Sequence, residues 1–81
     1  MKYLFTPSAE DDFDRLTRPE RKRIGEKMRF YASQENPLDH AERLTGSHEY
    51  RFRIGDYRVM FEILHGTLWI TAIKRRDEAY R

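Results

Sequence analysis

The sequence contains no cysteine and, among 81 residues, only four glycines, three prolines and one tryptophan. Without cysteine, neither a disulfide nor a thiolate metal site can stabilise the fold. The histidines at positions 40, 48 and 65 are scattered and match no metal-ligand spacing, so we expect no metal site and no cofactor. No apolar run reaches the roughly 18 residues of a membrane span, and the first six residues are too short a run for a signal peptide. We therefore expect a cytoplasmic protein with no membrane partner.

Charged residues are abundant, at 37% of the chain, but they nearly balance, with 16 Lys+Arg against 14 Asp+Glu. A charged chain can be disordered, yet disordered chains are poor in aromatic residues, and here aromatics make up 14%. The composition therefore predicts one small globular domain over residues 1–81. A chain of this size buries only roughly 60 to 65% of its unfolded surface, so its core is thin and a partner chain is expected to add stability.

The first half of the chain reads as one strand followed by two helices. Residues 2–6 alternate as in a strand and end at Pro7, after which Ser8 is expected to cap a helix over residues 9–16. Thr17 and Glu20 have the spacing of a capping box, and the apolar positions that follow predict a helix over residues 18–33. Residues 34–48 are polar and are expected to form a connecting loop.

The second half changes from helical to alternating spacing. Strands are expected over residues 50–54, 57–63 and 68–73, joined by the short turns Gly55-Asp56 and His65-Gly66. Connections this short force neighbouring strands to be antiparallel. The predicted fold is therefore α+β with the order βααβββ, two helices packing on one face of an antiparallel sheet.

Two-residue turns also predict which residues face each other. The first hairpin would place Arg53 opposite Arg58, and the second would place Val59 opposite Ala72. Alternation then assigns the following side chains to the sheet face away from the helices: Arg51, Arg53, Arg58, Met60, Glu62, Trp69, Thr71 and Ile73. Lys74, Arg75 and Arg76 leave the last strand close to the same patch.

This arginine pairing is informative because like charges directly opposite on a sheet destabilise it by up to about 1 kcal/mol. Residues 50–76 hold six basic and two acidic side chains, whereas four acidic residues cluster within positions 10–14. A concentrated basic face with aromatic neighbours suits a phosphate backbone and stacked bases. An ordinary solvated face, in which Asp56 and Glu62 neutralise two of the arginines, and a protein–protein surface remain alternative interpretations.

Three segments resemble a known family. They are Leu44-Thr45-Gly46, the stretch YRFRIGDYRVMFEI at residues 50–63, and IKRRDEAYR at residues 73–81. Together with the FTPSA motif at residues 5–9 and Asn36-Pro37, they are similar to the RelE/ParE superfamily, the toxins of type II toxin-antitoxin systems. The resemblance implies a βααβββ fold like that of microbial ribonucleases, which agrees with the element order above.

The superfamily has two branches with different targets. RelE-like members are ribosome-dependent endoribonucleases that cleave mRNA, and ParE-like members inhibit DNA gyrase without catalysis. This sequence resembles the RelE branch, which implies catalytic roles for Arg51, Arg53, Arg58, Arg75 or Arg76, and Tyr80. Lys74, Trp69 and Glu62 are expected to line the RNA-binding surface, with Glu62 also a candidate base or ion-pair partner. A ParE-like gyrase inhibitor and a non-cleaving RNA-binding domain are the alternatives.

The implied reaction is attack of the substrate's own 2'-hydroxyl on the adjacent phosphate. Arginine forks suit the charge-stabilising role, and weak acid-base groups leave most of the rate to orientation of the RNA. Arg58→Ala is expected to abolish cleavage while leaving the fold intact. The implied partners are the ribosome with its mRNA and a cognate, RelB-like antitoxin, the latter in a toxin–antitoxin hetero-oligomer that binds operator DNA through the antitoxin.

Overall fold

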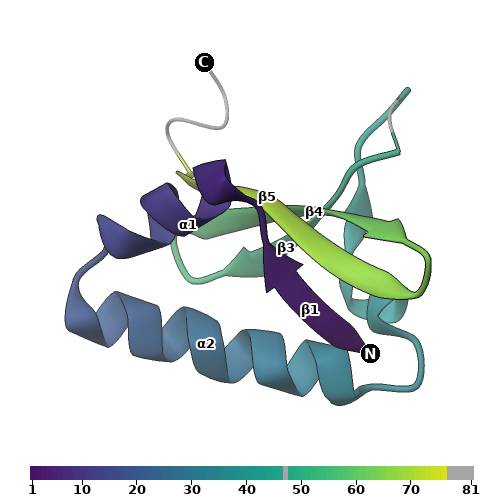
Figure 1. Ribbon diagram of the computed structural model, residues 1–81, viewed down its shortest axis with the longest axis horizontal. Coiled ribbons are helices and arrows are strands. Elements are labelled where there is room, and N and C mark those ends of the chain that lie inside the picture. The colour runs from purple at the N-terminus through teal and green to yellow at the C-terminus, as the bar shows by residue number, and fades with distance from the viewer. Residues whose placement is uncertain (47, 77–81) are drawn as a thin grey trace.

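Five strands, two α-helices and one 3₁₀ helix form the part of the chain that the computed structural model describes, residues 1–46 and 48–76. Figure 1 shows α2 lying across one face of the sheet, with α1 beside one end of it. The α+β class is confirmed. The elements are β1 (Lys2–Phe5), α1 (Pro7–Asp14), α2 (Arg18–Ser33), η1 (Pro37–His40), β2 (Glu42–Arg43), β3 (Tyr50–Ile54), β4 (Tyr57–Leu64) and β5 (Thr67–Arg75).

The strands form one sheet in the order β1-β5-β4-β3-β2. Strands β2 to β5 pair antiparallel, as expected from their short connections, but β1 pairs parallel to β5. The sheet is therefore mixed rather than wholly antiparallel. The long connection from β1 through both helices frees β1 from hairpin pairing with the next strand, and it lies instead beside β5 and parallel to it.

The start of α1 differs from the sequence-based expectation, whereas that of α2 does not. Thr6 caps α1, because its hydroxyl accepts a 3.2 Å hydrogen bond from the Ala9 amide and Pro7 fills the first turn. Ser8, the expected cap, therefore lies inside the helix, which ends at Asp14. Helix α2 has the expected bounds, and its capping box forms in both directions between Thr17 and Glu20.

The segment after α2 is more ordered than a connecting loop. Pro37–His40 forms the 3₁₀ helix η1, which Asn36 caps through its side chain. Glu42 and Arg43 then form β2, which pairs with β3 and adds a fifth strand at the sheet edge. A two-residue strand has no alternation to detect, so the sequence pattern does not reveal it.

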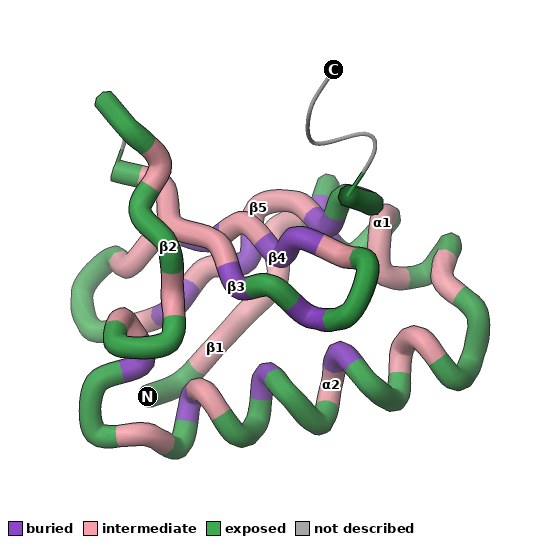
Figure 2. The backbone as a smooth tube through the Cα atoms, turned by 180° about the vertical axis from the view of Figure 1, so that it is seen from behind, coloured by how far each residue is buried: buried purple, intermediate pink, exposed green. Residues whose placement is uncertain are grey.

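Stacked aromatic rings join α2 to the sheet in the core. The rings of Phe52 and Phe61 stack at 4.3 Å, and Tyr31 of α2 stacks on Phe52 at the same distance. Ile24 and Met28, four residues apart on α2, are almost fully buried against this cluster. Figure 2 shows the buried positions gathered on β3, β4 and β5 and on the side of α2 that faces them.

The register of the first hairpin is confirmed, and that of the second is only partly right. Arg53 lies opposite Arg58, and Phe61 lies opposite Ile70. Between Ile70 and Ala72, however, Thr71 is an extra residue that forms a bulge, so Val59 faces Ile73 and not Ala72. The bulge turns Ile73 into the core, where it is 5% exposed, and the expectation that it lies on the other face is wrong.

Helix α1 completes the edge of β5 where β1 ends. The Thr6 amide still donates to the Ile70 carbonyl at 2.9 Å, but the chain then turns into α1. The Asp12 carboxylate takes over as a partner of β5 by accepting a 3.0 Å hydrogen bond from the Ile73 amide. Within the described ranges, neither helix is long and apolar enough to cross a membrane.

Candidate active site

Four basic side chains share the sheet face opposite α2, and we call them the arginine face: Arg51, Arg53, Arg58 and Lys74. Arg53 of β3, Arg58 of β4 and Lys74 of β5 lie side by side across three strands, because Arg58 is the register partner of both others. Arg51 lies two residues before Arg53 on the same side of β3. The hairpin register therefore brings together three of the predicted catalytic arginines and the predicted RNA-binding lysine.

A carboxylate from β2 pairs with two of these arginines. Glu42 Oε2 lies 3.0 Å from a terminal nitrogen of Arg51 and 3.3 Å from its Nε. The other oxygen, Oε1, lies 3.0 Å from Nε of Arg53. This position follows from the β2–β3 register, in which Glu42 is the partner of Arg51. Glu42, rather than Glu62 or Asp56, thus provides the carboxylate between Arg51 and Arg53.

The charges of three arginines act on Glu42. The hydrogen bond from Arg51 and the charges of Arg53, Arg51 and Arg58 hold the pKa of Glu42 below its ordinary value of 4.5. The carboxylate is therefore ionised at neutral pH. Two guanidinium groups of β3, those of Arg51 and Arg53, consequently converge on a single anion that is itself 45% exposed.

Arg58 differs from its neighbours because it is only 2% exposed. It occupies the central strand of the three, with Arg53 and Lys74 on its two sides. A large side chain this deeply buried contributes to packing, so its removal leaves a cavity. The burial of Arg58 therefore predicts that Arg58→Ala also destabilises the fold, in addition to any effect on cleavage.

Trp69 and Glu62 lie on the same face but away from the arginine pair. They are register partners of each other on β5 and β4, and both are half-buried. Glu62 stands four residues along β4 from Arg58, a separation of about 13 Å in a strand. Trp69 therefore lies on the arginine side of the sheet but away from Arg58, and Glu62 is not the nearest carboxylate to the arginines.

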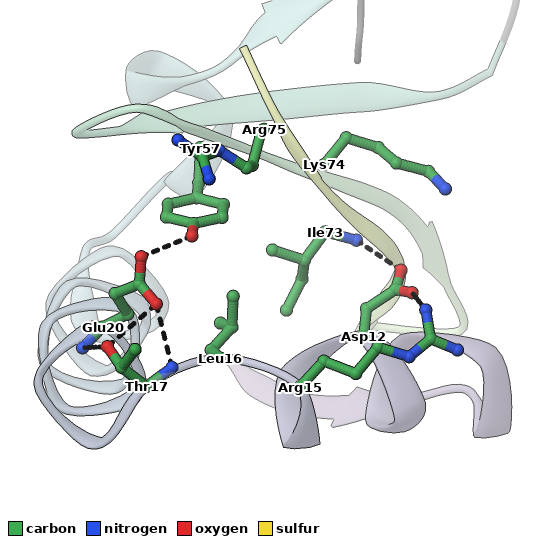
Figure 3. A pocket seen from close by; sticks show the side chains of 9 residues that line it. All are labelled: Asp12, Arg15, Leu16, Thr17, Glu20, Tyr57, Ile73, Lys74 and Arg75. Atoms are coloured by element: carbon green, nitrogen blue, oxygen red, sulfur yellow. Dashed lines mark hydrogen bonds and ion pairs between the residues drawn. The ribbon is translucent and has the colours of Figure 1, made fainter. Parts of the chain in front are cut away.

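The structure separates Arg75 from the arginine face. Arg75 is the register partner of Tyr57, on the side of the sheet that the helices cover. Figure 3 shows Tyr57 pointing at Glu20 of α2, and the Tyr57 hydroxyl donates a 2.5 Å hydrogen bond to that carboxylate. This bond, the capping bonds of Thr17 and the charge of Arg75 lower the pKa of Glu20.

The two remaining predicted residues stand at the end of the chain. Arg76 follows β5 directly, and its amide donates a 2.7 Å hydrogen bond to the Asp56 carbonyl at the first hairpin turn. Arg76 is therefore held beside the turn between Arg53 and Arg58. Tyr80 lies outside the described residues.

A cavity of about 400 Å³ lies between the α1–α2 connection and the end of β5. Figure 3 shows contacts among several of its lining residues: Glu20 accepts from Tyr57, and Asp12 accepts from the Ile73 amide and pairs with Arg15. These contacts fix the helices to the sheet. Across residues 1–46 and 48–76, no group of three acidic or histidine side chains is placed to hold a metal ion.

The comparisons with known proteins agree with this architecture. A family model described as the ParE toxin of type II toxin-antitoxin systems, parDE, matches residues 3–80. The chain therefore belongs to this toxin family, within the RelE/ParE superfamily. A comparison with curated proteins gives no significant match.

Solved structures of both branches share the fold. The RelBE2 toxin–antitoxin complex from Mycobacterium tuberculosis matches at 25% identity with a TM-score of 0.79, covering 93% of this chain and 96% of that chain. The RelB–RelE complex from Methanococcus jannaschii matches at 27% identity and a TM-score of 0.73, with coverage of 95% and 94%. The chromosomal ParDE system from P. aeruginosa matches at 19% identity and 0.70, covering 93% and 95%, which is a likeness of fold alone.

Proposed function

We propose that this toxin is a RelE-like endoribonuclease that cleaves mRNA on the ribosome, in the cytoplasm, and thereby inhibits translation. The observation that carries the proposal is the in-register row of Arg53, Arg58 and Lys74, with Arg51 beside it, on one face of the sheet. An inhibitor that acts only by binding needs no convergence of guanidinium groups on a single anion. Phosphoryl transfer does need it, because negative charge develops on the phosphate oxygens.

In the proposed reaction the 2'-hydroxyl attacks the adjacent phosphate, and the bond to the 5'-oxygen of the next nucleotide breaks. Arg51 and Arg53 bind the phosphate oxygens in two-point contacts, and Arg58 adds charge from beneath them. Glu42 is the carboxylate next to this position, which makes it a better candidate than Glu62 to accept the 2'-hydroxyl proton. Its lowered pKa keeps it ionised but makes it a weak base.

Residues at the chain end complete the proposed site. The placement of Arg76 beside the first hairpin turn, with Arg75 on the helix side, favours Arg76 as the arginine that contacts the leaving group or the next phosphate. The role of Tyr80 stays a prediction from the family resemblance. Trp69 stacks on a base further along the RNA, and Lys74 binds the backbone.

We further propose a RelB-like antitoxin as the cognate partner. Several structures of the same fold are complexes of RelE with RelB. An antitoxin segment that covers the arginine face would block the RNA and stabilise the thin core. Binding of operator DNA by the hetero-oligomer would then take place through the antitoxin.

The second candidate function is inhibition of DNA gyrase without catalysis. The family model that matches is the ParE toxin model, and a ParDE structure shares the fold. Glu42 also neutralises part of the arginine face, which a purely binding surface would tolerate.

Induction of the toxin in cells separates the two functions. Primer extension on cellular mRNA should reveal new 5' ends within minutes, whereas plasmid supercoiling and a purified gyrase assay should be unaffected. Arg53→Ala is the matched control, because this exposed side chain can be removed without disturbing the core. Loss of supercoiling with intact mRNA would establish the gyrase function instead.

A further inference from the structure

We propose that Glu42 is an internal counter-anion that occupies the phosphate-binding position of the arginine face, so that a phosphodiester binds by displacing this carboxylate from Arg51 and Arg53. The inference rests on the proposed function for the identity of the phosphodiester as RNA. The exchange of one anion for another is a property of the folded toxin itself.

The geometry of the contacts is that of a bound oxyanion. Two nitrogens of Arg51 approach one oxygen of Glu42 at 3.0 and 3.3 Å, and Nε of Arg53 approaches the other oxygen at 3.0 Å. Guanidinium groups bind phosphate through the same edges and at similar distances. The carboxylate therefore uses the donors that two phosphate oxygens would need, and both anions cannot use them at once.

The position of Glu42 in an edge strand allows its side chain to move away from Arg51 and Arg53. Its strand β2 has only two residues and pairs with β3 alone at the edge of the sheet. Its side chain is 45% exposed, and neither residue of β2 belongs to the buried core. Release of the carboxylate to water therefore breaks no core packing, in contrast with Arg58, which is 2% exposed.

Displacement also changes the chemistry of the carboxylate. While paired, Glu42 is held below its ordinary pKa mainly by the hydrogen bond from Arg51. When a phosphate takes that donor, the carboxylate loses its stabilising partner, and a nearby negative phosphate raises its proton affinity. The substrate thus converts a masked carboxylate into a stronger base beside the bond to be broken.

The test uses inorganic phosphate and a trinucleotide with a 2'-deoxy group at the cleavage position as probes. Binding to the purified toxin is measured by titration at fixed ionic strength, following the Nε–H signals of Arg51 and Arg53 by NMR. Glu42→Gln keeps the shape but removes the competing charge, and we expect it to tighten phosphate binding on the order of threefold to tenfold, the scale for one unit charge at about 4 Å near water. Glu62→Gln is the matched control, because it removes the same charge from the same face about 13 Å from Arg58.

A tighter affinity in Glu42→Gln, with little change in Glu62→Gln and with shifts of both arginine signals in the wild type, supports the proposal. Equal gains in phosphate affinity in the two variants would mean that only the net charge matters. Unchanged or weaker binding in Glu42→Gln would show that phosphate does not displace the Glu42 carboxylate. Either result overturns the proposal. Melting temperatures of the variants verify folding, and Glu42→Ala provides a second variant that removes the same competing charge. The titrations need neither a ribosome nor RNA cleavage. If phosphate displaced Glu42 in the purified toxin but mRNA stayed intact in cells, the proposed endoribonuclease function would be rejected and the anion exchange would stand.

Discussion

Arg53 and Arg58 lie directly opposite each other across the first hairpin, yet the Arg53 side chain is 55% exposed and Arg58 is only 2% exposed. The two arginines therefore share a face and a charge but not an environment. Arg53 is available to a ligand at little structural cost, whereas Arg58 is part of the packing beneath it. Substitution of each residue should consequently have a different signature.

Arg53→Ala should reduce mRNA cleavage at least tenfold without destabilising the fold. The exposed guanidinium contributes to phosphate binding, but surface substitutions of this kind shift the melting temperature of a small domain by no more than about 4 °C. Thermal unfolding and a cleavage assay on translating ribosomes measure the two effects. A variant that cleaves as well as the wild type would remove Arg53 from the site.

Arg58→Ala should lower the free energy of unfolding by about 1–3 kcal/mol, because a buried side chain is lost and its cavity is not refilled. Arg58→Lys keeps the charge and much of the stem, so it should recover part of the stability but not the two-point contact to phosphate. Urea unfolding of both variants provides the measurement. If Arg58→Ala were as stable as Arg53→Ala, the burial of Arg58 would not contribute to the stability of the fold.

Asp12→Ala should destabilise the protein by about 1–2 kcal/mol, because the Ile73 amide loses its acceptor in a partly buried position. Asp12→Asn retains a side-chain oxygen and should restore most of the loss. Hydrogen exchange of the Ile73 amide is the direct measurement, and it should accelerate in the alanine variant. Exchange at an unchanged rate would mean that another group protects this amide.

The Glu20–Tyr57 bond should make stability depend on pH at both extremes. It lowers the pKa of Glu20 from 4.5, so its stabilisation is present above that value and is lost as the pH falls through the pKa of the folded state. It raises the pKa of Tyr57 from 10.0, so its stabilisation is present below that value and is lost as the pH rises through the pKa of the folded state.

Glu42 also contributes to the loss of stability at low pH, but not to the loss at high pH, because its pKa is lowered too. Comparison of the wild type with Tyr57→Phe isolates the Glu20–Tyr57 bond, since Glu42 is present in both proteins. The stability difference between the wild type and Tyr57→Phe should be constant between about pH 5 and pH 9 and should shrink on either side. Chemical unfolding at a series of pH values tests this shape. A difference that stays the same at pH 3 and pH 11 would contradict a bond between the two side chains.

Local patterns predicted the strongest features of the fold. The spacing of Thr17 and Glu20 identified the start of α2, and the two-residue turn at Gly55-Asp56 set the register that pairs Arg53 with Arg58. Both features depend on residues close together in the chain, which is why the sequence alone predicts them.

The remaining features depend on contacts between distant segments. The bulge at Thr71 has no marker in the sequence, and it placed Ile73 in the core, Lys74 on the arginine face and Arg75 on the helix side of the sheet. Glu42 sits in a strand of two residues, so only its pairing with β3 identifies it as the partner of Arg51 and Arg53. The arginine face was predictable from alternation, but its counter-anion was not.

The most direct test of the central claim is primer extension on a defined mRNA in a purified translation system, with wild-type toxin and Arg53→Ala compared at equal concentration. The account predicts that the mRNA is cleaved only when ribosomes are present, with a strong loss of cleavage in the variant. Intact mRNA with the wild-type toxin, or equal cleavage by both proteins, would contradict it.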